Sequence, residues 1–153
     1  MTIGDRCVVH HQCTLEGRLR IGNGVKIMAH VYLPSTTEIG SLVFIGPGTI
    51  FLNDRYPMRR AAPVSGPCIG DHVSIGGGVT ICPVVTVGRN CIIGAGSVVT
   101  KDVPPNTLAY GNPARHYPLP DPISQGNLPE LLLPQTDLFN AHGDDSWRNE
   151  DWL

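Results

Sequence analysis

The sequence predicts an all-β protein whose chain winds into a parallel β-helix of about five triangular coils, and two observations support this prediction. A large apolar residue recurs at every sixth position from Ile3 to Phe51, and the pattern resumes from Ile69 to Val99. The residue after it is glycine at eight of these positions. The chain of 153 residues also holds 18 Gly and 14 Pro, a density that would break helices every few residues. A fixed short period of this kind indicates a solenoid.

Each six-residue unit is expected to form one short strand and a corner, so that three units complete a coil of about 18 residues. The first position points inward and stacks on its counterpart in the next coil. The fifth position also points inward but meets the corner, so it must be small, and Cys7, Cys13 and Cys91 occupy it as core residues. Glycine at the second position is expected because its backbone accepts angles that a Cβ would resist.

The repeat is interrupted once, at residues 52–68, which contain three Pro and three Arg and lack the six-residue period. If Phe51 belongs to the third strand of its coil, a loop of about a dozen residues leaves near Tyr56 and returns before Ile69. A long loop on a rigid scaffold is a common place for functional residues. The alternative is a loop that only covers a sheet face or packs on a neighbour.

Charge divides the chain into two parts. Residues 1–117 hold ten basic and six acidic side chains, a net charge of +4, and form the predicted β-helix. Residues 118–153 hold seven acidic side chains and only Arg148, a net charge of −6, and are expected to form an irregular tail. Trp147 and Trp152 suggest that this tail docks on the prism's open lower end or on a partner, and disorder is the alternative. The basic part suits phosphate-bearing ligands but not nucleic acid.

Composition also predicts a compartment and an assembly. No apolar run approaches the roughly 20 residues of a membrane span, and the N-terminus has no apolar signal core. The five cysteines form no Cys-x-x-Cys pair, which favours reduced thiols and a cytoplasmic protein. Burial of one aliphatic side chain per unit falls short of the entropy cost of ordering the chain, so we expect an oligomer.

Residues 69–115 carry the most specific stretch, which ends in GAGSVVTKDVPPNTLAYGNPAR. This stretch, with the repeat over residues 1–117, resembles the hexapeptide-repeat acyltransferases. The resemblance implies that the β-helix is left-handed and that three chains form a homotrimer. It also implies that acetyl-CoA is the co-substrate, bound in the groove between two prisms, and that no metal is needed.

The resemblance assigns parts of CoA to individual positions. Five small residues would let the pantetheine arm approach the backbone: Gly76, Gly77, Gly94, Ala95 and Gly96. Thr100, Lys101 and Arg115 would lie beside the adenine and the phosphates. The chemistry agrees, because a thin thioester arm needs a wall without side chains and phosphates need cations. Each glycine could instead be a turn residue of the repeat.

The loop residues FLNDRYPMR, 51–59, resemble the Phe-x-Asn-Asp-x-x-Pro-Arg stretch of sugar-nucleotide 3-amino-sugar N-acetyltransferases. The resemblance implies acetylation of an amine on a dTDP- or UDP-linked hexose, in surface-polysaccharide or antibiotic-sugar synthesis. This chain departs from the family pattern in two ways. Met58 intervenes before the arginine, and the first coils are clipped, with the repeat already running at Ile3.

A sugar amine can attack the thioester directly, so the protein would supply alignment and oxyanion stabilisation rather than a strong base. Asn53 is the candidate to orient the amine or donate to the oxyanion, and Asp54 could position the sugar or accept a proton late. Arg59 and Arg60 could hold the nucleotide diphosphate, with Arg55 as a further substrate contact. Asn-Asp pairs also begin turns, which is the structural alternative.

Other mechanisms depend on histidine. A hydroxyl acceptor must lose its proton during attack, and O-acetyltransferases of the superfamily use a His base. His72, facing outward in the first coil after the loop, is the candidate catalytic histidine, and the outward-facing His30 is a candidate substrate contact. A carbonic-anhydrase-like zinc site from His10, His11 and His30 is another alternative, although the expected His-x4-His pair is absent. The last alternative is a non-catalytic scaffold.

Overall fold

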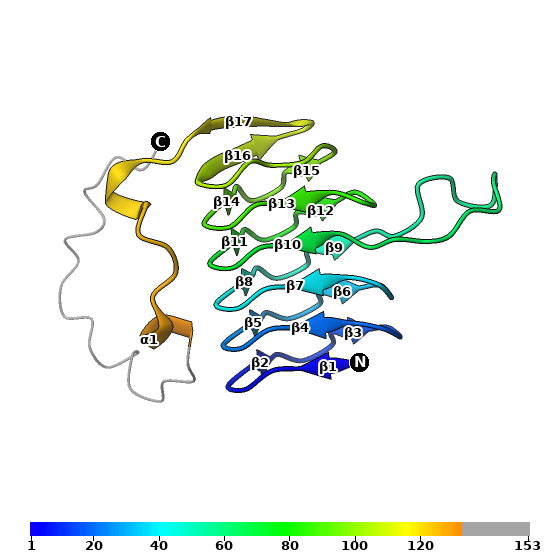
Figure 1. Ribbon diagram of the computed structural model, residues 1–153, viewed down its shortest axis with the longest axis horizontal. Helices are drawn as coiled ribbons and strands as arrows, with labels where there is room; N and C mark the ends of the chain where they lie inside the picture. Colours follow the sequence, from blue (N-terminus) through cyan, green and yellow to red (C-terminus); the bar gives the residue numbers. More distant parts are fainter. Residues whose placement is uncertain (133–153) are drawn as a thin grey trace.

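Three parallel sheets form the sides of a prism in the computed structural model, which describes residues 1–132 (Figure 1). The chain visits the three sheets in turn, one two-residue strand in each, before it rises to the next coil. The predicted fold class, a left-handed parallel β-helix, is confirmed. There are five full coils, and one further strand begins a sixth.

The sheets are called A, B and C here. Sheet A consists of β1 (Thr2–Ile3), β4 (Arg20–Ile21), β7 (Glu38–Ile39), β10 (Cys68–Ile69) and β13 (Thr86–Val87). Sheet B begins with β2 (Val8–Val9), β5 (Lys26–Ile27), β8 (Phe44–Ile45), β11 (Ser74–Ile75) and β14 (Ile92–Ile93). Sheet C consists of β3 (Thr14–Leu15), β6 (Tyr32–Leu33), β9 (Ile50–Phe51), β12 (Thr80–Ile81) and β15 (Val98–Val99).

The pairing register of the strands gives the number of residues in a coil and in the insertion. Arg20 pairs with Glu38, a step of 18 residues, whereas Glu38 pairs with Cys68, a step of 30. The difference shows that the interruption adds 12 residues to the third coil, as the period predicted. The insertion begins earlier than expected, because the backbone N–H of Ser65 donates to the carbonyl of Asn53 (2.9 Å) and closes the loop there.

The core is the stack of first and fifth positions. From Ile21 upward, all the first-position residues are buried, and so are fifth-position residues such as Val25, Thr49 and Ser97. The first coil differs, because within residues 1–132 it has a neighbouring coil on one side only, and Ile3 remains 42% exposed. Cys91 is buried and Cys7 and Cys13 pack against the core, which confirms their predicted place.

The expected reason for the second-position glycines was wrong. None of the eight adopts a positive φ. A Cβ on any of them would lie 2.4–2.7 Å from an atom of the neighbouring coil, as at Gly46, whose Cβ would meet the carbonyl carbon of Gly76 at 2.5 Å. Glycine is required there because stacked coils approach closely at that point, not because of its backbone angles.

A hairpin closes the upper end of the prism. The six-residue period ends with β15, and β16 (Thr107–Gly111) then pairs parallel with β14 in sheet B. β17 (Ala114–Pro118) returns antiparallel to β16 after a turn that contains the cis Asn112–Pro113 bond. This hairpin was not predicted, because its strands lie outside the repeat.

Residues 119–132, called the strap here, run back down the prism on the side opposite the inserted loop (Figure 1). They hold one turn of 3-10 helix, Asp121–Ile123, and the short helix α1 (Pro129–Leu132). Asn127 fixes the strap, since its amide donates to the carbonyls of Leu42 (2.9 Å) and Val73 (3.0 Å). The predicted docking of Trp147 and Trp152 falls outside the described residues.

No helix within residues 1–132 combines the length and the apolar character that a membrane crossing would require.

Candidate functional site

The corners between sheets form three edges, named A/B, B/C and C/A, and each carries a different surface. At the A/B and B/C edges every coil places one residue in the left-handed backbone region. The A/B edge fills this position with side chains in successive coils, including Leu42, His72 and Asn90. The B/C edge fills it with glycine in three successive coils, at Gly48, Gly78 and Gly96. The C/A edge carries the inserted loop.

The B/C edge is free of side chains over these three coils. A Cβ added to Gly48, Gly78 or Gly96 would find no atom within 4 Å, so the edge opens to solvent. Left-handed geometry alone does not explain three glycines in a row, because the A/B edge accepts Leu and His in the same conformation. A bare backbone edge of this kind can receive a narrow ligand along its length. We call these three residues the glycine edge.

The five small residues predicted to contact CoA all lie at the B/C edge, but they differ in their surroundings. Gly76 and Gly94 face the neighbouring coil, where a Cβ would lie 2.6 Å and 2.7 Å from its atoms, so their glycine is structural. A Cβ on Gly77 would come within 3.2 Å of the Pro47 carbonyl, Ala95 is exposed, and Gly96 belongs to the glycine edge.

Gly48 and Gly78 were not among the residues predicted to contact CoA. A signal was present, since Gly78 and Gly96 both stand at the fourth place of their units and are 18 residues apart. Gly48 occupies the same place on the far side of the 30-residue step.

A basic hollow of about 540 Å³ lies at the upper end, lined by Lys101, Ala114, Arg115, His116 and Tyr117. The structure therefore brings together Lys101 and Arg115, two of the residues predicted to meet the phosphates, while Thr100 lies exposed next to Lys101. Tyr117 stacks on Tyr110 with ring centroids 4.4 Å apart. A side-chain hydrogen bond between them, with a smaller effect of burial, raises the pKa of Tyr110.

Asn53 and Asp54 stand at the start of the inserted loop. The Asn53 side-chain amide donates to the carbonyl of Ser35 in the coil below (3.1 Å), which fixes the orientation of the amide. The Asp54 carboxylate accepts from the backbone N–H of Tyr56 (2.8 Å), so it forms the turn that was its structural alternative. Asn53 keeps a second N–H and its oxygen without a partner among the described residues.

The inserted loop, defined as residues 54–64, extends away from its own prism (Figure 1). Its hydrogen bonds within the described chain join only its own residues. Arg55, Arg59 and Arg60 are all exposed, as are Tyr56 (48%) and Met58 (101%). Exposed apolar side chains of this kind are typical of a surface that binds another molecule.

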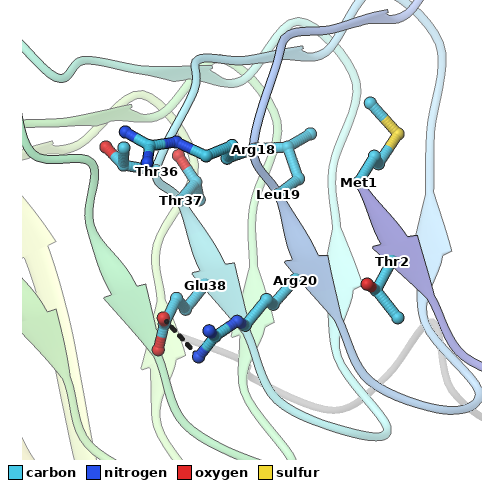
Figure 2. Close-up of a pocket in the computed structure, with 8 residues that line it drawn as sticks. All are labelled: Met1, Thr2, Arg18, Leu19, Arg20, Thr36, Thr37 and Glu38. Carbon is cyan, nitrogen blue, oxygen red and sulfur yellow. Dashed lines mark hydrogen bonds and ion pairs between the residues drawn. The ribbon is translucent and has the colours of Figure 1, made fainter.

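A second hollow, of about 420 Å³, lies one coil below the loop on the sheet A side (Figure 2). Arg18 and Thr36 line it, and Arg20 and Glu38 point toward each other from neighbouring strands to form an ion pair at 3.3 Å. Both members of that pair are largely exposed, so it stabilises the fold little.

The histidines do not gather at the loop. His72 lies at the A/B edge beneath Gly126 of the strap, and its Nδ1 is buried without a hydrogen-bond partner among the described residues. His30 lies at the B/C edge below the glycine edge, in edge-on contact with His11 (5.6 Å between centroids). Residues 1–132 contain no group of three or more His, Cys, Asp or Glu side chains suited to a metal ion.

The candidate site is therefore divided within one chain. The glycine edge and the root of the inserted loop lie on the two opposite edges of sheet C. The basic hollow lies on the upper end, where the glycine edge leads to the hairpin turn at Gly111.

Comparison with known proteins agrees with this architecture. Residues 18–53 and 69–101, the two runs of repeat on either side of the loop, match the family described as bacterial transferase hexapeptide (six repeats). A hexapeptide-repeat-containing acetyltransferase of Vibrio cholerae is 35% identical, and the alignment covers 78% of this chain and 74% of that chain with a TM-score of 0.66. This chain belongs to the hexapeptide-repeat acetyltransferase family.

Other members of the hexapeptide-repeat family extend the comparison. The Vibrio cholerae protein has also been solved in complex with acetyl-CoA. A maltose O-acetyltransferase of Clostridium difficile 630 is 33% identical over 77% of this chain and 68% of that chain, with a TM-score of 0.65. The galactoside O-acetyltransferase of Escherichia coli K12 is 42% identical over 86 residues, 52% of this chain and 42% of its own length. The first curated relatives are matched over only 40–53% of their length.

Proposed function

We propose that this protein is an acetyl-CoA-dependent N-acetyltransferase whose acceptor is the amine of a dTDP- or UDP-linked amino sugar. The observation that most supports an acetyl-CoA donor is the bare glycine edge, which rises toward the basic hollow with Lys101 and Arg115. The pantetheine arm lies along Gly78 and Gly96, where no Cβ stands in its way, and the phosphates meet the two cations. The complex of the Vibrio cholerae relative with acetyl-CoA supports the same donor.

The inserted loop supplies the acceptor side of the site. Asn53, held by Ser35, uses its remaining N–H to donate to the oxyanion or its oxygen to accept from the amine. Arg55, Arg59 and Arg60 are exposed and contact the nucleotide diphosphate through charge-assisted bonds.

The reaction is a single acyl transfer. The neutral sugar amine attacks the thioester carbonyl carbon, a C–N bond forms, the C–S bond breaks, and CoA leaves as its thiol after taking up the proton that the amine loses. Alignment of the two substrates and hydrogen bonding to the developing oxyanion are the main contributions of the protein.

A complete site needs two copies of the chain. The inserted loop projects away from its own prism, and its root lies across sheet C from its own glycine edge. In a homotrimer the loop of one subunit covers the glycine edge of the next, which buries Tyr56 and Met58 and places Asn53 near the thioester.

The test is release of CoA thiol from acetyl-CoA with a panel of nucleotide-linked amino sugars and their hydroxyl counterparts. We expect thiol release and an acetylated product only with the amines. Thiol release with hydroxyl sugars alone would overturn the choice of acceptor, and no detectable binding of acetyl-CoA by calorimetry would overturn the enzyme class.

Sugar O-acetylation is the second candidate, and the galactoside and maltose O-acetyltransferases among the relatives favour it. It requires a base for the hydroxyl, and His72 is the candidate catalytic histidine. The same panel decides between the two, because it compares amine and hydroxyl acceptors directly.

A further inference from the structure

Two β-branched residues at the corners of the prism adopt a left-handed backbone conformation. Among the non-glycine residues of 1–132 with positive φ, only Thr36 (φ 73°) and Val84 (φ 68°) are β-branched. A β-branched side chain crowds the backbone in this region, so such residues are rarely found there. The other left-handed corners use glycine or side chains that are not branched at Cβ.

Both residues flank the root of the inserted loop. Thr36 occupies the C/A edge one coil below the insertion, and Val84 occupies it one coil above. The backbone N–H of Val84 donates to the carbonyl of Ser65 (3.2 Å), where the loop returns. Backbone strain of this kind persists where the surroundings fix it, and it gathers at functional sites.

Thr36 also connects the two limbs of the loop. Its hydroxyl oxygen accepts from the backbone N–H of Gly66 on the returning limb (2.8 Å), and its own proton is donated to the carbonyl of Ser35. The same Ser35 carbonyl accepts from the Asn53 amide on the outgoing limb. A continuous hydrogen-bond chain therefore runs from Gly66 through Thr36 and Ser35 to Asn53.

Gly66 packs directly against the backbone of the corner that carries Thr36. It is buried, and a Cβ there would lie 2.6 Å from the Thr37 hydroxyl and 2.7 Å from the Thr37 nitrogen. The returning limb is therefore pressed against the corner that carries Thr36, and a change in the Thr36 hydroxyl transmits to both limbs.

We propose that Thr36 is a positioning residue, whose hydroxyl sets the orientation of the Asn53 amide and of the inserted loop. The inference rests on the proposed role of Asn53 in acetyl transfer. Thr36 acts through the Ser35 carbonyl and the Gly66 N–H.

The kinetic test compares Thr36→Val, which keeps the branched shape and removes the hydroxyl, with Thr36→Ser, which keeps the hydroxyl. We expect Thr36→Val to lower kcat by about 10–100-fold with KM for acetyl-CoA within about twofold, and Thr36→Ser to stay within about threefold of wild type. Thr107→Val is the control, since its hydroxyl also donates to a backbone carbonyl, that of Pro105 (3.3 Å), away from the loop. Equal kcat in Thr36→Val and Thr107→Val would overturn the proposal.

A second measurement does not depend on activity. Arg55, Arg59 and Arg60 make the inserted loop a substrate for trypsin, and mass spectrometry locates the cuts. We expect cleavage there to accelerate several-fold in Thr36→Val and not in Thr36→Ser or Thr107→Val. An unchanged cleavage rate in Thr36→Val would overturn the proposal even if the wild-type protein transfers acetyl groups. Wild-type protein without transferase activity would refute the proposed function, and the cleavage rates alone would then decide the role of Thr36.

Discussion

Single residues at the B/C edge test whether CoA lies there. Asn tolerates left-handed backbone better than other side chains, so Gly78→Asn and Gly96→Asn add a side chain to the bare edge with little strain. We expect each to raise KM for acetyl-CoA by about tenfold or more, a loss of about 1.4 kcal/mol. Leu42→Asn, in the same conformation at the A/B edge, is the matched control and should leave KM unchanged. An unaltered KM in both glycine variants would remove the edge from the donor site.

Asn53 and His72 separate the two acceptor chemistries. Asn53→Ala should lower kcat by about 10–1000-fold, because a donor to the oxyanion is lost, while binding of acetyl-CoA remains. His72→Asn should keep turnover within about threefold, because His72 lies under the strap at the A/B edge, away from the loop root. Steady-state kinetics of both variants give the answer. A histidine-dependent mechanism would be favoured if Asn53→Ala kept full activity or if His72→Asn lost its activity.

At the scale of elements, the inserted loop should be separable from the prism. Residues 54–64 hydrogen-bond only among themselves, and Asn53 and Ser65 already meet at 2.9 Å. Replacing residues 54–64 by two glycines should shift Tm by only a few degrees and preserve binding of acetyl-CoA, while transfer to the acceptor is lost. Differential scanning calorimetry and isothermal titration measure these effects. A protein that no longer folds would show that the loop is structural.

Asn127 should contribute to the stability that the strap gives to the prism. Asn127 accepts from the Ser74 hydroxyl (2.6 Å) and donates to the carbonyls of Leu42 and Val73. Asn127→Ala therefore leaves the Ser74 hydroxyl and the Leu42 carbonyl without a protein partner, whereas the Val73 carbonyl keeps the backbone N–H of Phe44. We expect the free energy of unfolding to fall by about 1–3 kcal/mol in urea denaturation. Gln125→Ala, at an exposed neighbouring position, is the control and should change it by less than about 0.5 kcal/mol.

Some of the strands could be predicted from the sequence and others could not. The six-residue period predicted the strands from β1 to β15 and the length of the insertion, because each unit repeats the same packing problem. It did not predict β16 and β17, since their residues lie outside the six-residue period. It did not predict the strap either, because Asn127 contacts Val73 and Leu42, which lie 54 and 85 positions away in the chain. Lys101 and Arg115, predicted together from the resemblance, line one hollow. Of the predicted small residues Gly96 lies at the open edge, whereas Gly76 and Gly94 pack between coils.

At the scale of the whole molecule, sheet C is the side between the two halves of the site. Its strands and corners leave Ile50 (43%), Leu52 (37%) and Val84 (56%) exposed. Apolar side chains along a flat face, beside a projecting loop, fit an interface with a second copy of the chain. The sequence could not place these features relative to each other, because the division of the site becomes visible only when the three edges are assembled.

Complementation between two impaired variants, assayed well below the wild-type KM for acetyl-CoA, tests the central claim, that each site combines the glycine edge of one subunit with the inserted loop of another. One variant carries Gly78→Asn and Gly96→Asn with an intact loop, and the other has residues 54–64 replaced by two glycines with an intact edge. After equal amounts are refolded together and mixed trimers are verified by native mass spectrometry, we expect about a quarter of wild-type activity, since one interface in each mixed trimer is complete. Mixed trimers with no activity above that of the separate variants would contradict the claim.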